Sequence, residues 1–200
     1  MAVDRSLDAE RDSDPWLADH TDLLRPGLAV LDLGCGNGDD SQDLVERGLQ
    51  VVAFDQSRVS LRRARRRASK IRIVHGDMRA PSPFADATFD LIVASLSLHY
   101  FTWQQSERII EEVRRILRPS GWLICRVNRV GDVHFEYGKG AEIEPDFFEV
   151  RPGHFKRFFT EDSLRRLLDG AFDVDSLVPR VSMRWRKEKQ TLVARAQCRA

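Results

Sequence analysis

VLDLGCGNGDD, residues 30–40, is the stretch of sequence that decides the fold of this chain. An apolar run that contains one acid leads into three glycines at alternate positions, Gly34, Gly36 and Gly38, and two aspartates follow them. This pattern predicts a buried strand, a tight turn and the first residues of a helix. Because glycine has no Cβ, a ligand can closely approach the backbone of such a turn. The stretch therefore predicts the first strand–loop–helix unit of a Rossmann-like nucleotide site.

The composition is that of an ordinary globular domain. The 200 residues suit a single domain, and 42% hydrophobic residues against 32% charged residues are enough to build a core. The net charge of +1 gives no overall field that would favour nucleic acid or a membrane surface. Neither a signal-peptide core nor a transmembrane run is found, so we expect a cytoplasmic protein. Cys35, Cys125 and Cys198 are odd in number and widely spaced, which indicates reduced thiols and no metal site.

Predicted strands and helices alternate along most of the chain. Apolar runs predict strands at about 29–33, 50–54, 71–75, 89–94 and 122–127, and two closing strands at 172–178 and 191–196. Helices are predicted at 39–46, after the cap residue Ser57, at 102–117 and at 160–169. This alternation implies a mostly parallel sheet with helices on its faces. The polar stretch 184–189 between the closing strands is predicted to be an exposed turn.

Two segments lie outside this alternation. Residues 1–27 are interpreted as a polar arm followed by a helix that begins at Asp14-Pro15, an N-cap acceptor before a proline. This helix would either cover the sheet or place Trp16 or His20 at the mouth of a ligand cleft. Residues 128–159 mix glycine, proline and charge with many aromatic residues, and we interpret this irregular stretch as a lid or substrate-binding insertion.

The residues that follow the strands point to the kind of ligand. In an open α/β sheet, ligands bind beyond the carboxyl ends of the strands. Asp55 follows the second strand and could accept hydrogen bonds from ribose hydroxyls, while Asp77 and Met78 follow the third and could contact an adenine. Asp39 and Asp40, at the start of the first helix, would repel a phosphate. The glycine spacing also differs from the dinucleotide fingerprint. These features predict a pocket for a cationic cofactor that carries no phosphate.

The motifs together resemble those of the class I S-adenosylmethionine (SAM) dependent methyltransferases over about residues 28–196. VLDLGCGNG (30–38) is similar to their first motif, VVAFDQS (51–57) to the acidic motif of their second strand, and HGDM (75–78) to their adenine loop. FDLIVASLSLHY (89–100) and LRPSG (117–121) resemble their fourth motif and the entry to their fifth strand. The resemblance implies an α/β Rossmann-like three-layer sandwich, whose seven-stranded, mostly parallel sheet has an antiparallel last strand.

The resemblance also implies roles for individual residues, with SAM as the cofactor. The glycine turn would face its methionine part, Asp55 its ribose, and Ser95 and Leu96 its reacting methyl group. The residues expected to bind the cofactor are Asp32, Gly34, Cys35, Gly36, Asn37, Asp55, Gln56, Ser57, Gly76, Asp77, Met78, Ser95 and Leu96. Two of these have a simpler interpretation: Cys35 would only fill space, and Asp32 would only hold the turn through hydrogen bonds to backbone.

Methyl transfer is an in-line displacement in which positioning supplies much of the acceleration. A base is needed only when the acceptor holds a proton near neutral pH. His99 and Tyr100, after the fourth strand, are the candidate catalytic residues, although they could instead pack beneath the insertion. Candidate substrate contacts are Trp16, His134, Tyr137 and His154.

The sequence therefore predicts a methyltransferase that acts on a small molecule, at an O, N, S or C atom. No signature of DNA base methylation follows the fourth strand, and the near-neutral charge disfavours nucleic acid as a partner. Two alternatives stay open. One is a methyltransferase of RNA or protein that uses the arginines of 62–67, and the other is a SAM-binding protein without catalysis. The oligomeric state cannot be predicted.

Overall fold

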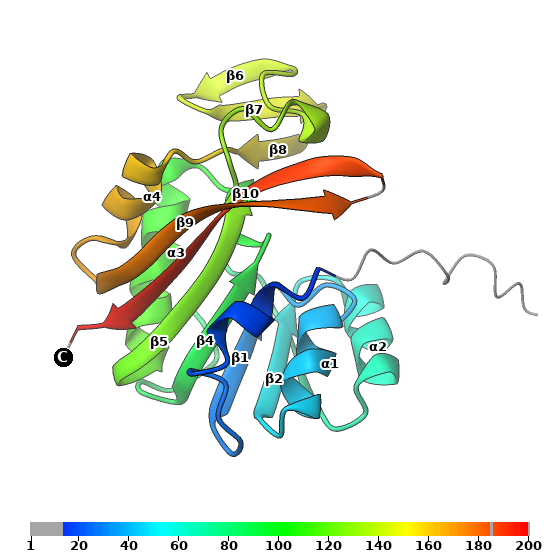
Figure 1. Ribbon diagram of the computed structural model, residues 1–200, viewed down its shortest axis with the longest axis vertical. Helices are drawn as coiled ribbons and strands as arrows, with labels where there is room; N and C mark the ends of the chain where they lie inside the picture. The colour runs from blue at the N-terminus through cyan, green and yellow to red at the C-terminus, as the bar shows by residue number, and fades with distance from the viewer. Residues whose placement is uncertain (1–13, 185, 200) are drawn as a thin grey trace, which may run out of the picture.

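A computed structural model describes residues 14–184 and 186–199, so the predicted arm 1–13 lies outside the described residues (Figure 1). A seven-stranded sheet has the strand order β3-β2-β1-β4-β5-β10-β9, and β1 to β5 are parallel to one another. β10 is antiparallel to both of its neighbours. The strands are β1 Ala29–Leu33, β2 Gln50–Asp55, β3 Arg72–His75, β4 Phe89–Ser95, β5 Leu117–Asn128, β9 Phe172–Arg184 and β10 Lys187–Cys198.

Helices cover both faces of the sheet, which makes three layers and confirms the predicted fold class. The α-helices are α1 Asp39–Glu46, α2 Arg58–Arg67, α3 Trp103–Ile116 and α4 Glu161–Leu168, and the short 3-10 helices are η2 Trp16–His20, η3 Leu98–Tyr100 and η4 Val133–Phe135. Alternate residues of each strand enter two separate cores. Leu31 and Leu33 of β1 join the core with α3 and α4, whereas Val30 joins the core with Trp16 and α1.

Side chains cap the starts of α2, α3 and α4, and the cap of α2 is the predicted Ser57. Ser57 Oγ accepts a hydrogen bond from the amide of Ser60 at 3.2 Å. Thr102 and Gln105 form a reciprocal capping box at the start of α3, and Thr160 and Ser163 form another at the start of α4. These caps satisfy amide groups that the first turn of a helix leaves without partners.

The N-terminal segment differs from its prediction. The expected helix is a five-residue 3-10 helix, η2, and no side chain caps it. The carboxylate of Asp14 instead forms ion pairs with Arg126 of β5 and Arg180 of β9. Asp14 is therefore a tether between the segment and the sheet, because two guanidinium groups are stronger partners for it than one backbone amide.

Residues 128–159 are more regular than predicted. They form a three-stranded antiparallel sheet of β6 Ala141–Glu144, β7 Phe147–Arg151 and β8 His154–Arg157, which lies above the β9–β10 hairpin, past the carboxyl end of β5, in the view of Figure 1. Glycines in the turns and charged residues within the strands interrupt the alternation of apolar and polar residues. The short strands could therefore not be recognised from the sequence pattern. We call residues 128–159 the cap. Its role as a lid or substrate-binding insertion, and the single-domain organisation, stay predictions.

The stretch 184–189, predicted to be an exposed turn, is exposed at Arg184 and at residues 186–188, but the flanking strands reach further into it than predicted and Lys189 is buried. β9 and β10 form one long hairpin whose pairing runs from Phe172 with Cys198 to Arg184 with Lys187. Lys189 is only 5% exposed, because the start of β10 lies beside the end of β5. Within the described residues, no helix is long and apolar enough to cross a membrane.

The cap of α3 gives a test of these helix assignments. We expect Thr102→Ala to lower the free energy of unfolding by about 1 kcal/mol, since it removes the side-chain acceptor of the Gln105 amide. Thr102→Ser keeps the hydroxyl and should stay close to the parent protein. Urea unfolding followed by circular dichroism measures both, and equal stabilities for the two variants would contradict the capping role.

Candidate cofactor and active site

The three glycines after β1 have positive φ angles, from +53° to +82°, but they meet different surroundings. A Cβ on Gly34 would lie 2.4 Å from Ser97 Cβ, and one on Gly38 would lie 2.7 Å from Ala64 Cα. These two glycines allow the turn to pack against β4 and α2. A Cβ on Gly36 would meet nothing within 4 Å. Gly36 is therefore where the turn leaves backbone open to a ligand.

Asp55 joins the glycine turn to the end of β2. One carboxylate oxygen accepts a hydrogen bond from the Gly36 amide at 2.9 Å, and the other accepts one from the Ser57 amide at 2.7 Å. Each oxygen keeps a second lone pair, so the carboxylate can hold the turn and still accept hydroxyl groups of a ligand. Ser57 itself caps α2, and its neighbour Gln56 is exposed.

Two further carboxylates lie beneath the turn. Asp32 is buried, accepts a short 2.5 Å hydrogen bond from Ser41 Oγ and is also bonded by the Ser41 backbone. Burial, followed by the charge of Asp40, raises the pKa of Asp32 to about 8. Burial also raises the pKa of Asp40, whose carboxylate accepts a 2.9 Å hydrogen bond from Trp16 Nε1. Asp32 thus holds the first turn of α1, and not the glycine turn as the simpler interpretation had it.

The end of β4 is fastened to both neighbouring strands. Ser97 Oγ donates to the Leu33 carbonyl of β1 at 2.7 Å. Arg126 of β5 donates to Ser95 Oγ at 2.9 Å, and its carbonyl accepts the Leu96 amide at 2.7 Å. Leu96 has a φ of +52°, a strained conformation for a leucine. The structure therefore positions this segment beside the glycine turn, as expected for residues that face a cofactor.

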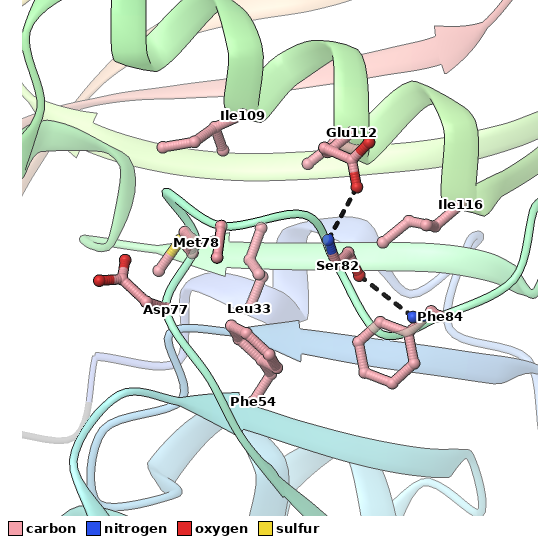
Figure 2. Close-up of a pocket in the computed structure, with 11 residues that line it drawn as sticks. Leu33, Phe54, Asp77, Met78, Ser82, Phe84, Ile109, Glu112 and Ile116 are labelled. Carbon is pink, nitrogen blue, oxygen red and sulfur yellow. Dashed lines mark hydrogen bonds between the residues drawn. The ribbon is translucent and has the colours of Figure 1, made fainter.

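The third strand end borders a small cavity (Figure 2). Its volume is about 20 Å³, enough for one water molecule, and Leu33, Phe54, Met78 and the α3 side chains Ile109 and Ile116 line it. Asp77 lies at the rim, where Arg79 binds its carboxylate at 2.6 Å and lowers its pKa. Contact with an adenine amino group would thus have to compete with Arg79. Gly76 is pressed against the Phe54 ring.

His99 and Tyr100, the candidate catalytic residues, lie in η3 with their rings 4.2 Å apart. His99 is buried, and burial together with the nearby Lys189 brings its pKa well below the ordinary 6.5. The imidazole is therefore neutral at physiological pH. Tyr100 is 50% exposed, and partial desolvation raises its pKa. Both lie on the carboxyl side of β4, where a methyl acceptor would be expected.

The four predicted substrate contacts are not brought together. Trp16 is 1% exposed, with the Arg126 guanidinium over its ring, so its contacts support the sheet-covering interpretation. His134 and His154 are exposed on the cap, whereas Tyr137 packs on Phe148 and Phe158 and donates to Asp146 at 3.3 Å. Their role in binding a substrate stays a prediction.

Two predicted cofactor residues lie in the glycine turn itself. Burial strongly raises the pKa of Cys35, and Asn37 is half-buried beside it.

Sequence reasoning missed a buried polar cluster at the carboxyl edge of the sheet, formed by Asn128, Asp132 and Lys189. Lys189 Nζ donates to Asn128 Oδ1 at 2.6 Å and to Asp132 Oδ2 at 2.7 Å. Polar residues at the end of the apolar strand β5 were the only available signal. Lys189 gave no such signal, because it lies far from Asn128 and Asp132 in the sequence and is part of a polar stretch.

The raised pKa of Asp32 has a consequence for stability. Its carboxyl titrates near 3.8 when unfolded and near 8 when folded, so between these values it ionises on unfolding, and stability falls as pH rises. We expect Asp32→Asn to raise the free energy of unfolding by at least about 1 kcal/mol at pH 7. The gain should grow between pH 5 and pH 8.

Urea unfolding at pH 5, 6, 7 and 8 measures this gain. Asp43→Asn, which removes a half-exposed carboxylate from the neighbouring helix α1, is the matched control and should change stability little. A destabilised Asp32→Asn, or a gain that shrinks as pH rises, would mean that Asp32 is ionised in the folded protein.

Comparisons with known proteins agree with this geometry. A family model described as a methyltransferase domain matches residues 30–121, from β1 to the entry of β5. An uncharacterized methyltransferase of Synechocystis sp. is 38% identical over 98 residues, which is 49% of this chain and 46% of the relative. The chain thus spans about half the length of the curated relatives it matches.

Two solved structures share the fold over nearly the whole chain. A SAM-dependent methyltransferase from Methanosarcina mazei has a TM-score of 0.80 at 24% identity, covering 94% of this chain and 99% of its own. The second is the 1,6-didemethyltoxoflavin-N1-methyltransferase of Burkholderia thailandensis, which was solved with 1,6-didemethyltoxoflavin and S-adenosylhomocysteine bound. Its TM-score is 0.75 at 24% identity, and the match covers 98% of this chain and 82% of that enzyme. Residues 30–121 thus match a methyltransferase domain, and the fold around them is the one that these solved methyltransferases share.

Proposed function

We propose that this protein transfers the methyl group of SAM to a small-molecule acceptor. One observation carries the proposal: the turn leaves backbone open at Gly36, beside the free lone pairs of the Asp55 carboxylate. Carboxylates attract a cationic ligand and would repel a phosphate. SAM supplies an activated methyl group on a sulfonium cation, so this donor set fits it.

The residues divide into those that would hold SAM and those beyond it. The open face of Gly36, with Cys35 and Asn37, would accommodate the methionine part, and Asp55 would accept the ribose hydroxyls. Asp77 and Met78 would border the adenine, with Gly76, Gln56 and Ser57 shaping the loops around it. Ser95 and Leu96 would lie beside the transferred methyl group. His99 and Tyr100 would face the acceptor, and because burial and Lys189 hold the pKa of His99 well below 6.5, its neutral imidazole would serve as a hydrogen-bond partner and not as a base.

A small molecule is the acceptor best supported. The Burkholderia thailandensis enzyme, whose fold this chain shares, was solved with the small molecule 1,6-didemethyltoxoflavin bound. The three cysteines have no disulfide partners, which suits a reducing compartment, and we place the protein in the cytoplasm.

The alternative, an RNA or protein acceptor, would use the arginines of α2. Arg65 and Arg67 are already bonded to Ile71 and Asp39, which leaves a smaller basic surface than the sequence suggests.

The direct test is calorimetric titration with SAM, S-adenosylhomocysteine and NAD. SAM and S-adenosylhomocysteine should bind in the micromolar range and NAD should not. Incubation with methyl-labelled SAM and fractionated cell extract then shows whether the label enters small molecules, RNA or protein. Binding of NAD alone would refute the proposal, and label in RNA or protein would favour the alternative acceptor.

The glycines give a sharper test of where SAM binds. Gly36→Ala should fold with a small loss of stability, because its Cβ meets no protein atom within 4 Å and only the positive φ opposes it, yet it should weaken SAM binding at least tenfold because that Cβ fills the open face of the turn. Gly34→Ala should mainly lower thermal stability, since its Cβ collides with Ser97. Thermal melts and titrations of both variants separate the two effects. A Gly36→Ala variant with full SAM affinity would place the cofactor elsewhere.

Asp55 has two functions that different variants can separate. Asp55→Ala removes both the acceptor of the Gly36 amide and the expected ribose acceptor, so it should abolish measurable SAM binding. Asp55→Asn keeps one carbonyl oxygen and should lose about tenfold to a hundredfold. Asp86→Asn, an exposed carboxylate paired with Arg115, is the control and should bind normally. Unchanged affinity in Asp55→Ala would remove Asp55 from the cofactor site.

A further inference from the structure

Positive charge is concentrated in one short segment of the chain. Eight of the 32 lysines and arginines lie between Asp55 and Asp77, and none of the 31 aspartates and glutamates lies among them. The rest of the chain is therefore net acidic, and the overall charge of +1 conceals a strongly basic region. Seven of the eight side chains are exposed, namely Arg58, Arg62, Arg63, Arg65, Arg66, Lys70 and Arg72.

This segment forms α2 and β3. β3 is an edge strand at the end of the sheet opposite to β9, and α2 lies at the same end of the molecule (Figure 1). α2 packs against β2 and β3, and its buried residues are Leu61 and Ala64, so its arginines lie on the solvent side. Arg72 continues the exposed cations onto β3. We call the lysines and arginines of residues 58–72 the α2–β3 surface.

Most cations of the α2–β3 surface have no carboxylate partner. Arg67 pairs with Asp39, and the Arg65 guanidinium donates to the carbonyl of Ile71. The neighbouring Asp77 is already occupied by Arg79, which lies outside this surface. Within residues 14–184 and 186–199, no ion pair is formed by the remaining six, Arg58, Arg62, Arg63, Arg66, Lys70 and Arg72. These six are therefore available to an anionic partner.

Helix stability does not account for this arrangement. Arg58, Arg62 and Arg66 follow one another at i, i+4 spacing, where like charges repel each other and destabilise a helix. Arg58 is also the first residue of α2, beside the positive end of the helix dipole, and the first turn contains no acidic residue. Only the arginines of the last turn are favoured by the dipole. Charges that oppose the formation of their own helix indicate a role in binding.

The residue types of the α2–β3 surface define the partner. Guanidinium and ammonium groups are the donors that bind phosphates. Val59 and Ile73 are the exposed apolar side chains of this region, whereas a protein interface or a membrane anchor would need a larger apolar centre. Residues 56–76 include no Phe, Tyr or Trp on which an unpaired base could stack. A nucleic-acid duplex, which keeps its bases stacked inside and presents phosphates outside, fits these features best.

We propose that the α2–β3 surface binds a nucleic-acid duplex through its phosphates, without reading the base sequence. β2 and β1 separate β3 from β4, which places β3 about 14 Å from the strand that leads to Ser95 and Leu96. The duplex is therefore held away from the expected methyl group, as a docking partner and not as the methyl acceptor. The proposal does not depend on the proposed function, and either can fail without the other.

The first test is the salt dependence of binding by the full chain. Fluorescence anisotropy with a short labelled RNA duplex should give a micromolar or lower Kd at 50 mM salt. Six phosphate contacts predict a slope of about −5 for log K against log salt concentration, so affinity should fall about a thousandfold between 50 and 200 mM. A slope shallower than about −2 would overturn the proposal.

The second test compares probes. RNA and DNA duplexes of unrelated sequence should bind within threefold of one another, and a single strand of equal length should bind at least fivefold more weakly. Vesicles of phosphatidylglycerol and poly-glutamate, at equal concentration of negative charge, should bind at least tenfold more weakly than the duplex. A tenfold preference for one sequence would refute binding through phosphates alone. Tighter binding of the vesicles or of poly-glutamate would assign the surface to a membrane or to an acidic protein, and would also overturn the proposal.

A charge-neutralised variant locates the site. Replacing Arg58, Arg62, Arg63 and Arg66 together by Gln removes four contacts, so it should weaken duplex binding at least a hundredfold at 50 mM salt and bring the slope to about −2. The matched control replaces four exposed arginines outside the surface by Gln and should lose less than threefold; these are Arg108, Arg114, Arg151 and Arg165. Both variants should bind S-adenosylhomocysteine like the parent protein.

Thermal melts show whether the fourfold variant folds. If it does not, Lys70→Gln with Arg72→Gln, which lies outside α2, should weaken duplex binding at least fivefold and reduce the slope by about 2. Full duplex affinity in either folded variant, or an equal loss in the control, would refute the assignment. Duplex binding that depends on these residues in a protein that does not bind S-adenosylhomocysteine would leave this proposal standing while the proposed function fails.

Discussion

The contact between Gly34 and Ser97 is the constraint on which the site depends. A side chain on Gly34 would overlap Ser97, and the Ser97 hydroxyl bonds the carbonyl of Leu33. The end of β4 is therefore held against the turn that follows β1. Two residues further along the turn, Gly36 is open on the side where a Cβ would lie, and its amide donates to Asp55 of β2. The ends of β1, β2 and β4 are thus joined by two hydrogen bonds and by the close packing that the absence of a side chain on Gly34 allows.

Most of the fold was predictable because its signals are local. The apolar runs of β1, β2 and β4 stand out against polar surroundings, and capping residues such as Thr102 lie within three residues of the groups they satisfy. For the same reason the candidate site was found at the strand ends, since Asp55 and Ser95 follow directly on recognisable strands. The seven strands and the antiparallel last strand were implied by the resemblance to a known family, whereas the order of the strands was not predicted.

What could not be predicted depends on contacts between distant parts of the chain. Lys189 was assigned to an exposed turn because its neighbours are charged, and only its position beside Asn128, 61 residues away, explains its burial. Asp14 looked like a helix cap, yet Arg126 and Arg180 are its partners. The cap strands are four or five residues long and carry charges on their exposed side, so period-two alternation was too short to detect.

The place of β10 in the sheet affects how the chain is assembled during its synthesis. β10 follows every other strand of the sheet in the sequence, yet it lies between β5 and β9. Until β10 has been synthesised, both of those strands have an unpaired edge, and β5 carries the apolar run Trp122–Cys125. Unpaired edges of this kind invite association with other chains. During synthesis, the edge of β5 is therefore exposed until β10 pairs with it, and fast pairing of β10 limits aggregation at this edge.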